Sequence, residues 1–288
     1  MTDLHDLPSP VHAALGYLAP SAERPVSYAF EPPPGTPWEN CAYDRVRMPI
    51  ADARRAHEKA SIDREGFELH DAPTAVVDFL DDAQVRSVYY REASELALAV
   101  TGASRAFVFD HLVRHRARDR AALDFGRRGG EARVAANGRV HNDYTEGSGR
   151  KRLGLVLNDP QAEARVGRYA IVNIWRSING PVQDTPLAVC DARTVAAADL
   201  VVGEVRYPGR TGEIYLALHS PTHRWCYYSG MDRHEALVFK QFDSRPGGVA
   251  RFTPHAAFDL PDVPPDAPLR ESIELRCLVI HEDGGQRA

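Results

Sequence analysis

The sequence predicts a mainly β protein, a double-sheet jelly roll of the kind that includes the cupins, and two observations carry this prediction. After Gly102, short runs rich in Val, Ile, Leu and aromatic residues follow one another, separated by turns such as Asn179-Gly180-Pro181. Between the runs lie no helical patterns of comparable length, although an α/β fold would need helical crossovers there. The 21 Gly and 21 Pro, spread along the chain, also favour a β-rich domain over a helical bundle.

In chain order, residues 1–40 are Pro-rich and are expected to form an extended arm with little regular structure of its own. Four aromatic side chains predict that this arm packs on the body of the protein: Tyr17, Tyr28, Phe30 and Trp38. A helix is expected from Asp82 to Val100, where apolar residues recur at spacings of three, four and seven. Asp81 or Asp82 can cap its start, and Gly102 can end it.

The remaining elements are expected to be short strands with apolar character. They are residues 106–113, 139–144, 169–174, 186–189, 213–218, 225–228, 236–242 and 272–280. Turn residues such as those at 245–248 separate them, and no repeat of fixed period is present.

The composition narrows the class of function. The 288 residues contain 43% hydrophobic and 26% charged residues, as in globular proteins. Lys and Arg total 35 against 40 Asp and Glu, giving a net charge of -5, so we expect no nucleic-acid partner. No apolar run reaches the ~18 residues of a membrane span, and the start has no secretory signal, so we expect no membrane partner.

The four cysteines, at positions 41, 190, 226 and 277, lie far apart in the sequence. None is within four residues of another, which excludes a Cys-x-x-Cys zinc or redox motif. Their scatter predicts reduced, mostly buried thiols and a cytoplasmic location.

A metal-binding pair is indicated by His141-Asn142-Asp143, within the strand expected at 139–144. Residues i and i+2 of a strand point to the same face, so the imidazole and the carboxylate can share one metal ion. A second histidine from a distant strand would complete a two-His-one-carboxylate set, which leaves three positions open on Fe(II). The alternative is a hydrogen-bonded pair without a metal.

Arg270-Glu271-Ser272 opens the last apolar strand and is the one Arg-x-Ser in the chain. Its guanidinium and hydroxyl face one way and can bind a terminal carboxylate. His255 lies fifteen residues upstream, and we expect it on a strand adjacent to Arg270 in one barrel wall. His219 and His223 compete with His255 for the role of third ligand, but neither has an Arg-x-Ser at a comparable distance.

His-x-Asp, a distant His and Arg-x-Ser together resemble the Fe(II)/2-oxoglutarate-dependent dioxygenases. A narrower resemblance is to a hydroxylase/desaturase family of fungal and bacterial secondary metabolism. That family includes oxygenases of asnovolin-type and aziridine-forming pathways and a protein associated with cephalosporin methoxylation. The segments that carry this resemblance are 66–69, 101–103, 172–176, 190–193, 223–225, 239–244 and 270–276.

The resemblance implies a double-stranded β-helix with flanking helices, in one dioxygenase domain over 1–288. Residues 1–104 would be the arm and helical support, and 105–288 the core. His141, Asp143 and His255 would hold Fe(II), Arg270 and Ser272 would hold 2-oxoglutarate, and O2 would be the co-substrate. The implied activity is hydroxylation, desaturation or ring formation on a small-molecule natural product.

Three further residues are candidates for contact with that substrate: Asn173, Arg176 and His223. A buried Arg176 needs a partner, and an ion pair with Asp191 or Asp184 is the structural alternative to a substrate carboxylate. Two alternative functions remain: a jelly-roll binding protein, and a cupin-type metalloenzyme that does not use 2-oxoglutarate. Arg270-x-Ser272 argues against both. The expected partner is a small molecule, and a homodimer stays open.

Overall fold

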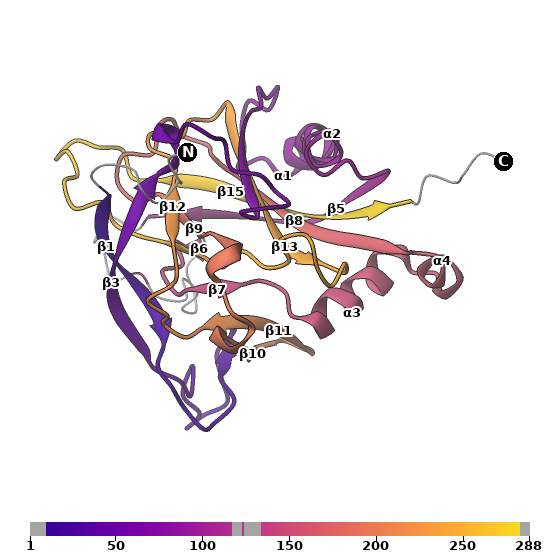
Figure 1. Cartoon of the computed structure of the whole chain (residues 1–288), viewed down its shortest axis with the longest axis horizontal. Helices are drawn as coiled ribbons and strands as arrows, with labels where there is room; N and C mark the ends of the chain where they lie inside the picture. The colour runs from indigo at the N-terminus through magenta and orange to yellow at the C-terminus, as the bar shows by residue number, and fades with distance from the viewer. Residues whose placement is uncertain (1–9, 117–122, 124–133, 283–288) are drawn as a thin grey trace.

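Two large curved β-sheets form the body of the molecule (Figure 1). The computed structural model of the chain describes residues 10–116, 123 and 134–282. Between the sheets, Val189 and Cys226 of one pack against Trp175, Leu237 and Phe239 of the other. This arrangement, with few helices, confirms the mainly β jelly-roll prediction.

In the described part of the chain, the larger sheet has nine strands. Their spatial order is β1 (Val11–Leu18), β3 (Tyr43–Asp52), β12 (Trp225–Tyr227), β9 (Leu187–Cys190), β14 (His255–Ala257), β7 (His141–Asn142), β11 (Arg210–Ala217), β10 (Leu200–Tyr207) and β2 (Val26–Tyr28). Neighbouring strands are antiparallel except for the pairs β12 with β3 and β10 with β2. The short strands β14 and β7 lie near its centre, where the candidate site is built.

The smaller sheet has six described strands. Their order is β4 (Phe67–Asp71), β13 (Glu235–Asp243), β8 (Arg168–Ser177), β15 (Glu271–His281), β5 (Arg105–His115) and β6 (Val134–Ala135). The central strand β8 alternates: Val172 and Ile174 face the helix that covers the sheet, whereas Asn173 and Trp175 face the other way. β15 alternates likewise, with Ile273, Leu275 and Cys277 under the same helix.

The expected helix is present and covers the outer face of the smaller sheet (Figure 1). It runs through α1 (Asp82–Gln84), a π-helical turn (Val85–Tyr89) and α2 (Tyr90–Thr101). The Asp81 carboxylate accepts hydrogen bonds from the first backbone amides, and Gly102 ends the helix with a φ of 64°. Short 3-10 turns lie at Ala53–Arg55, Ala192–Thr194 and Ala197–Asp199. No helix in the described residues combines the length and the apolar character that a membrane span requires.

A helix also lies between two of the expected strands, which the sequence did not indicate. It is α3 (Glu146–Leu157), followed by the shorter α4 (Pro160–Ala164). Thr145 caps α3 through a reciprocal hydrogen-bond pair with Ser148. Its three glycines weaken the helical pattern, and one of them, Gly149, lets the helix pack directly on the ring of Phe242.

The expectation of little regular structure in residues 1–40 is wrong for residues 10–40, and residues 1–9 lie outside the described part of the chain. β1 pairs with β3 along its whole length, and β2 pairs with β10. Ala13, Leu15 and Tyr17 alternate inward along β1, but the Ala and Gly residues between them carry little β signal. The expected packing of Tyr17 and Tyr28 is observed, because both side chains are buried.

The expectation that His255 and Arg270 lie on adjacent strands is also wrong. His255 opens β14 in the larger sheet, whereas Arg270 immediately precedes β15 in the smaller one. The loop between them crosses from one sheet to the other, which is the usual connection in a jelly roll. Spacing along the chain could not distinguish this crossing from a hairpin.

Candidate metal centre

His141, Asp143 and His255 converge at the centre of the larger sheet. His141 and His255 are directly paired residues of the antiparallel strands β7 and β14, so both rings stand on one face. Their ring centroids lie 4.3 Å apart, and one ligand atom of each of the three residues lies within 4.8 Å of the others. Among the Asp, Glu, His and Cys side chains of the described residues, these three form the one group close enough together to hold a metal ion.

Backbone carbonyls orient both imidazoles. The His141 Nδ1 lies 2.8 Å from the Arg139 carbonyl oxygen, and the His255 Nδ1 lies 3.3 Å from the Thr253 carbonyl oxygen. A carbonyl can only accept, so this contact favours a proton on each Nδ1 and leaves Nε2 as the ring atom that can bind a metal. The His141 Nε2 faces Asp143 Oδ1 at 3.5 Å. Such outer hydrogen bonds are how metal-binding histidines are usually held.

The Asp143 carboxylate is held by one of its oxygens. Its Oδ2 accepts hydrogen bonds from Asn173 Nδ2 and Arg276 Nε, each at 2.9 Å. Burial raises the pKa of this carboxyl group, but the nearby charge of Arg276 outweighs it and holds the pKa well below the usual range. The group is therefore ionised, with Oδ1 directed toward the histidines.

His255 is neutral at physiological pH. Burial lowers the pKa of its imidazole, His141 adds to this effect, and the pKa falls to about 3. A neutral imidazole is the form that binds metal ions.

A β-bulge carries another buried residue to this centre. The register between β13 and β8 shifts between Lys240 and Phe242, which leaves Gln241 as the extra residue. Its side-chain oxygen accepts from the backbone N–H of Asp143 at 2.7 Å, and its amide nitrogen lies 3.4 Å from the Thr253 carbonyl oxygen. Gln241 thus contacts the segments that carry Asp143 and His255.

Arg270 and Ser272 are buried on the smaller sheet and retain unused donors. Among the described residues, neither the Arg270 Nε nor the Ser272 Oγ has a hydrogen-bond partner. The Arg270 Nη1 donates to the Thr185 carbonyl at 3.1 Å, and its backbone N–H is fixed by Asp184. Burial lowers the pKa of Arg270 to about 10, so it is still protonated at neutral pH. A buried cation with free donors is suited to an anionic ligand.

These two residues share a strand face with Arg276. Ser272, Glu274 and Arg276 follow one another at intervals of two along β15, on the face away from the α2 helix. Arg276 contacts Asp143, and Ser272 is four residues, or about 13 Å of strand, further along. The unused donors therefore lie on the same inner wall as the group that holds Asp143.

A cavity of about 340 Å³ opens onto Asp143 and Arg276. Its walls come from α3, from the β10–β11 hairpin and from Asp110 of β5. Of the three residues of the candidate metal centre, Asp143 lines this cavity.

The structure places the three candidate substrate residues differently from one another. Asn173 lies at the centre, where it holds Asp143. Arg176 points to the opposite face of β8, and donates to the Tyr89 hydroxyl and to the carbonyls of Ala72 and Arg233. It pairs with neither Asp191 nor Asp184, and it does not join the cluster.

His223 is also occupied elsewhere. Its Nδ1 lies 3.0 Å from the Tyr17 hydroxyl and its Nε2 lies 3.1 Å from Asp199. The other competitor, His219, packs its ring edge-on against Tyr17. Neither histidine belongs to the group around Asp143.

The sequence analysis gave no role to Arg276 or Gln241. Arg276 could have been found, because it continues the i, i+2 pattern of Arg270 and Ser272 along one strand. Gln241 carries no such signal, since its position depends on a bulge within an apolar strand.

Comparisons with known proteins match the chain to a family model and to several enzymes. A family model described as an oxidoreductase/YMDC permease-like domain matches residues 15–280. The chain is 32% identical over 263 residues to the hydroxylase/desaturase efuI of Hormonema carpetanum, covering 84% of this chain and 85% of that protein. It is 31% identical over 259 residues to the Fe(II)/2-oxoglutarate-dependent dioxygenase nvfI of Aspergillus novofumigatus, covering 88% and 89%.

The fold also matches a solved structure. The iron and alpha-ketoglutarate-dependent endoperoxidase NvfI superposes with a TM-score of 0.84 at 24% identity, over 96% of this chain and 100% of that one. At this identity the match bears on the fold, which is the same jelly roll.

Proposed function

Because this chain belongs to the Fe(II)/2-oxoglutarate-dependent dioxygenases, we propose that His141, Asp143 and His255 hold its iron. The protein is an oxidoreductase, and its cofactors are those of the family, Fe(II) and 2-oxoglutarate, with O2 as co-substrate. The observation that carries the proposal is the convergence of the three side chains within 4.8 Å.

The donor set fits Fe(II). Two imidazoles, each with its Nδ1 against a backbone carbonyl, and one ionised carboxylate are the ligands of non-haem iron oxygenases. Arg276 and Asn173 occupy the other oxygen of Asp143, which favours a single bond from this carboxylate to the metal. Such a ligand set would leave three coordination positions on the metal for 2-oxoglutarate and O2.

We propose that Arg270 and Ser272 bind the far carboxylate of 2-oxoglutarate. The free Nε of Arg270 and the free hydroxyl of Ser272 are buried donors that such a carboxylate would satisfy. Trp175 lies beside the guanidinium, with the ring centroid 5.7 Å from its central carbon. This contact helps to fix the guanidinium plane.

When bound, Fe(II) would activate O2, which is the oxidant, and oxidative decarboxylation of 2-oxoglutarate to succinate and CO2 would supply two of the electrons that O2 takes up. The residues of this chain hold the proposed iron ligands in place and orient them. The carbonyls at 139 and 253 fix the imidazole rings, and Gln241 fixes the backbone at Asp143. The surrounding sheets exclude bulk water from the centre, since His141 and His255 are buried.

The substrate that we propose is a small-molecule natural product, oxidised by hydroxylation, desaturation or ring formation. Two relatives are named hydroxylase/desaturase or dioxygenase, and a third is named aspirochlorine biosynthesis protein N. We also propose a cytoplasmic location, because Cys41, Cys190, Cys226 and Cys277 are all free thiols.

The test is Fe(II) binding by anaerobic equilibrium dialysis. We expect His141→Ala, Asp143→Ala and His255→Ala each to lose most bound iron, because one ligand of three is removed. His219→Ala and His223→Ala are the matched controls and should bind one iron per chain. Circular dichroism verifies that each variant is folded. Normal iron content in folded variants of all three proposed ligands would overturn the assignment.

A further inference from the structure

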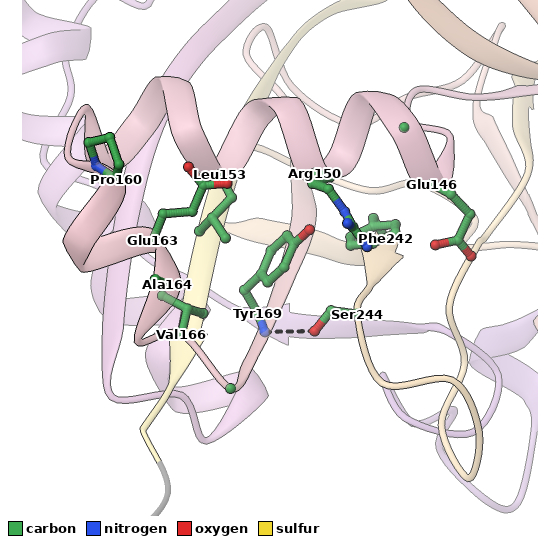
Figure 2. A pocket seen from close by; sticks show the side chains of 12 residues that line it. Glu146, Arg150, Leu153, Pro160, Glu163, Ala164, Val166, Tyr169, Phe242 and Ser244 are labelled. Carbon is green, nitrogen blue, oxygen red and sulfur yellow. Dashed lines mark hydrogen bonds between the residues drawn. The ribbon is translucent and has the colours of Figure 1, made fainter.

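Helix α3 separates two cavities and presents a different face to each. Figure 2 shows the first cavity, lined by Glu146, Arg150 and Leu153 of α3 together with residues of α4 and the strand ends. The cavity over the metal centre is lined by the other face of the helix, with Ser148, Lys151, Arg152 and Leu155. Both sets follow helical spacing, so one helix contributes separate groups to two sites.

The cavity over the centre contains cations without acidic partners. Its three carboxylates are already engaged: Asp143 and Asp110 by Arg276, and Glu213 by Arg24. Lys151, Arg152 and Arg210 also line it, and none of them forms an ion pair with a carboxylate of the described residues. The unpaired charge in this cavity is therefore positive.

The two arginines are held by aromatic rings. The Arg152 guanidinium carbon lies 4.5 Å from the centroid of the Phe109 ring, and that of Arg210 lies 3.9 Å from the Tyr207 ring. The Nε of Arg152 is buried and has no hydrogen-bond partner in the described part of the chain. A stacked guanidinium with a free Nε presents its donors in a fixed plane, as in sites that bind carboxylates through two parallel hydrogen bonds.

The remaining walls of this cavity include Leu155, Val205 and Ile214. They provide apolar surface beside the cationic groups. A volume of about 340 Å³ suits a compact ligand with one apolar body.

We propose that the substrate is an apolar molecule with a carboxylate, and that Arg152 binds this carboxylate with Lys151 and Arg210 beside it. This inference rests on the proposed function, because the cavity that binds the carboxylate is also the one that reaches the proposed iron ligand Asp143. The carboxylate is anchored on the α3 wall, and the apolar body extends toward Asp143. The anchor sets which carbon of the substrate lies nearest the metal.

The test uses the full chain loaded anaerobically with Fe(II) and N-oxalylglycine, a 2-oxoglutarate analogue that occupies the co-substrate position without reacting. Phenylalkanoic acids from phenylacetate to 6-phenylhexanoate are titrated by calorimetry, each beside its primary amide. We expect at least one acid to bind about ten- to hundredfold more tightly than its amide. Arg152→Gln should remove this preference.

Arg150→Gln is the matched control, because Arg150 lies on the same helix but lines the other cavity (Figure 2). It should keep the full preference for acids, whereas Lys151→Gln and Arg210→Gln should each reduce it partly. Equal binding of acids and amides, no binding of either series, or an equal loss in Arg150→Gln would overturn the proposal. Tighter binding of 3-phenylpropyl phosphate than of the acids would contradict a carboxylate site.

A parallel measurement separates this inference from the proposed function. The Fe(II) and 2-oxoglutarate complex is followed through its charge-transfer absorbance in the wild type and in Arg152→Gln. If the wild type lacks this absorbance, the proposed function fails whatever the acids do. If it is present in both while acids and amides bind alike, only the inference about the substrate fails.

Discussion

Arg276 and Asp143 form an ion pair that joins the two sheets at the candidate metal centre. Asp143 directly follows β7 of the larger sheet, and Arg276 lies on β15 of the smaller one, with 2.9 Å between Nε and Oδ2. The same guanidinium also reaches Asp110 and Glu274. The position of one proposed ligand therefore depends on a strand in the opposite sheet.

We expect Arg276→Lys to weaken Fe(II) binding about ten- to hundredfold, a typical effect of losing a partner behind a metal ligand. Lysine keeps the charge but cannot reproduce the three directed contacts of the guanidinium. Arg168→Lys is the control, because Arg168 pairs with buried Asp243 outside the site. Anaerobic Fe(II) titration measures the change, and equal affinity in the two variants would show that Arg276 does not position Asp143.

For the co-substrate, we expect Arg270→Lys to weaken 2-oxoglutarate binding while Fe(II) binding is retained. Loss of a charge-assisted hydrogen bond costs about 1.5–3 kcal/mol, or roughly ten- to hundredfold in affinity. Ser272→Ala should lose less, because it removes one neutral donor. The measurement is an anaerobic titration followed by charge-transfer absorbance. An unchanged dissociation constant in Arg270→Lys and also in Arg270→Ala would refute the carboxylate-binding role.

Packing of α3 predicts opposite effects for two of its glycines. A Cβ at Gly149 would lie 2.9 Å from the Phe242 ring, which is itself buried against Tyr169 and Phe252. We expect Gly149→Ala to lower the free energy of unfolding by about 1–3 kcal/mol. A Cβ at Gly154 would contact the movable end of the Glu163 side chain, so Gly154→Ala should raise the free energy of unfolding by about 0.5–1 kcal/mol. Urea unfolding measures the free energy of unfolding of both variants, and similar changes in the two would contradict the packing argument.

The buried His223 predicts a pH dependence of stability. Burial lowers the pKa of its imidazole, which outweighs the opposite effect of Asp199, and the charge of His219 lowers the pKa further. The unfolded chain then binds a proton more readily than the folded one, so stability falls as the pH drops through about 6.5. His223→Gln should flatten the stability curve between pH 7 and pH 5, measured by urea unfolding. Exposed His57→Gln is the control, and equal flattening there would argue against His223.

Much of the core could be predicted because its strands are apolar and continuous. The runs at 106–113, 169–174, 236–242 and 272–280 all lie within observed strands. β1 and α3 were missed because alanines and glycines occupy positions where apolar periodicity would otherwise be visible. Their formation depends on tertiary partners, namely β3 for β1 and the Phe242 ring for α3.

The candidate site could be predicted where its residues are two apart on a strand and therefore point to the same face. His141 with Asp143, and Arg270 with Ser272, are i and i+2 pairs that the sequence displays directly. The crossing between His255 and Arg270 and the bulge at Gln241 were not predictable, because they depend on how the two sheets are connected. Arg176 was a candidate substrate contact. Because side chains alternate along a strand, it points to the face of β8 opposite to Asn173 and contacts Tyr89 instead.

The division of the site between two sheets has a consequence for hydrogen-exchange kinetics. The proposed iron ligands belong to the larger sheet, and the proposed carboxylate donors belong to the smaller one. A ligand bound to residues of both sheets links them, because the sheets cannot separate without releasing it. Its binding free energy therefore adds to the cost of every fluctuation that parts them. Amide protons of β7 and β15 should slow together on ligand binding, although these strands share no backbone hydrogen bonds.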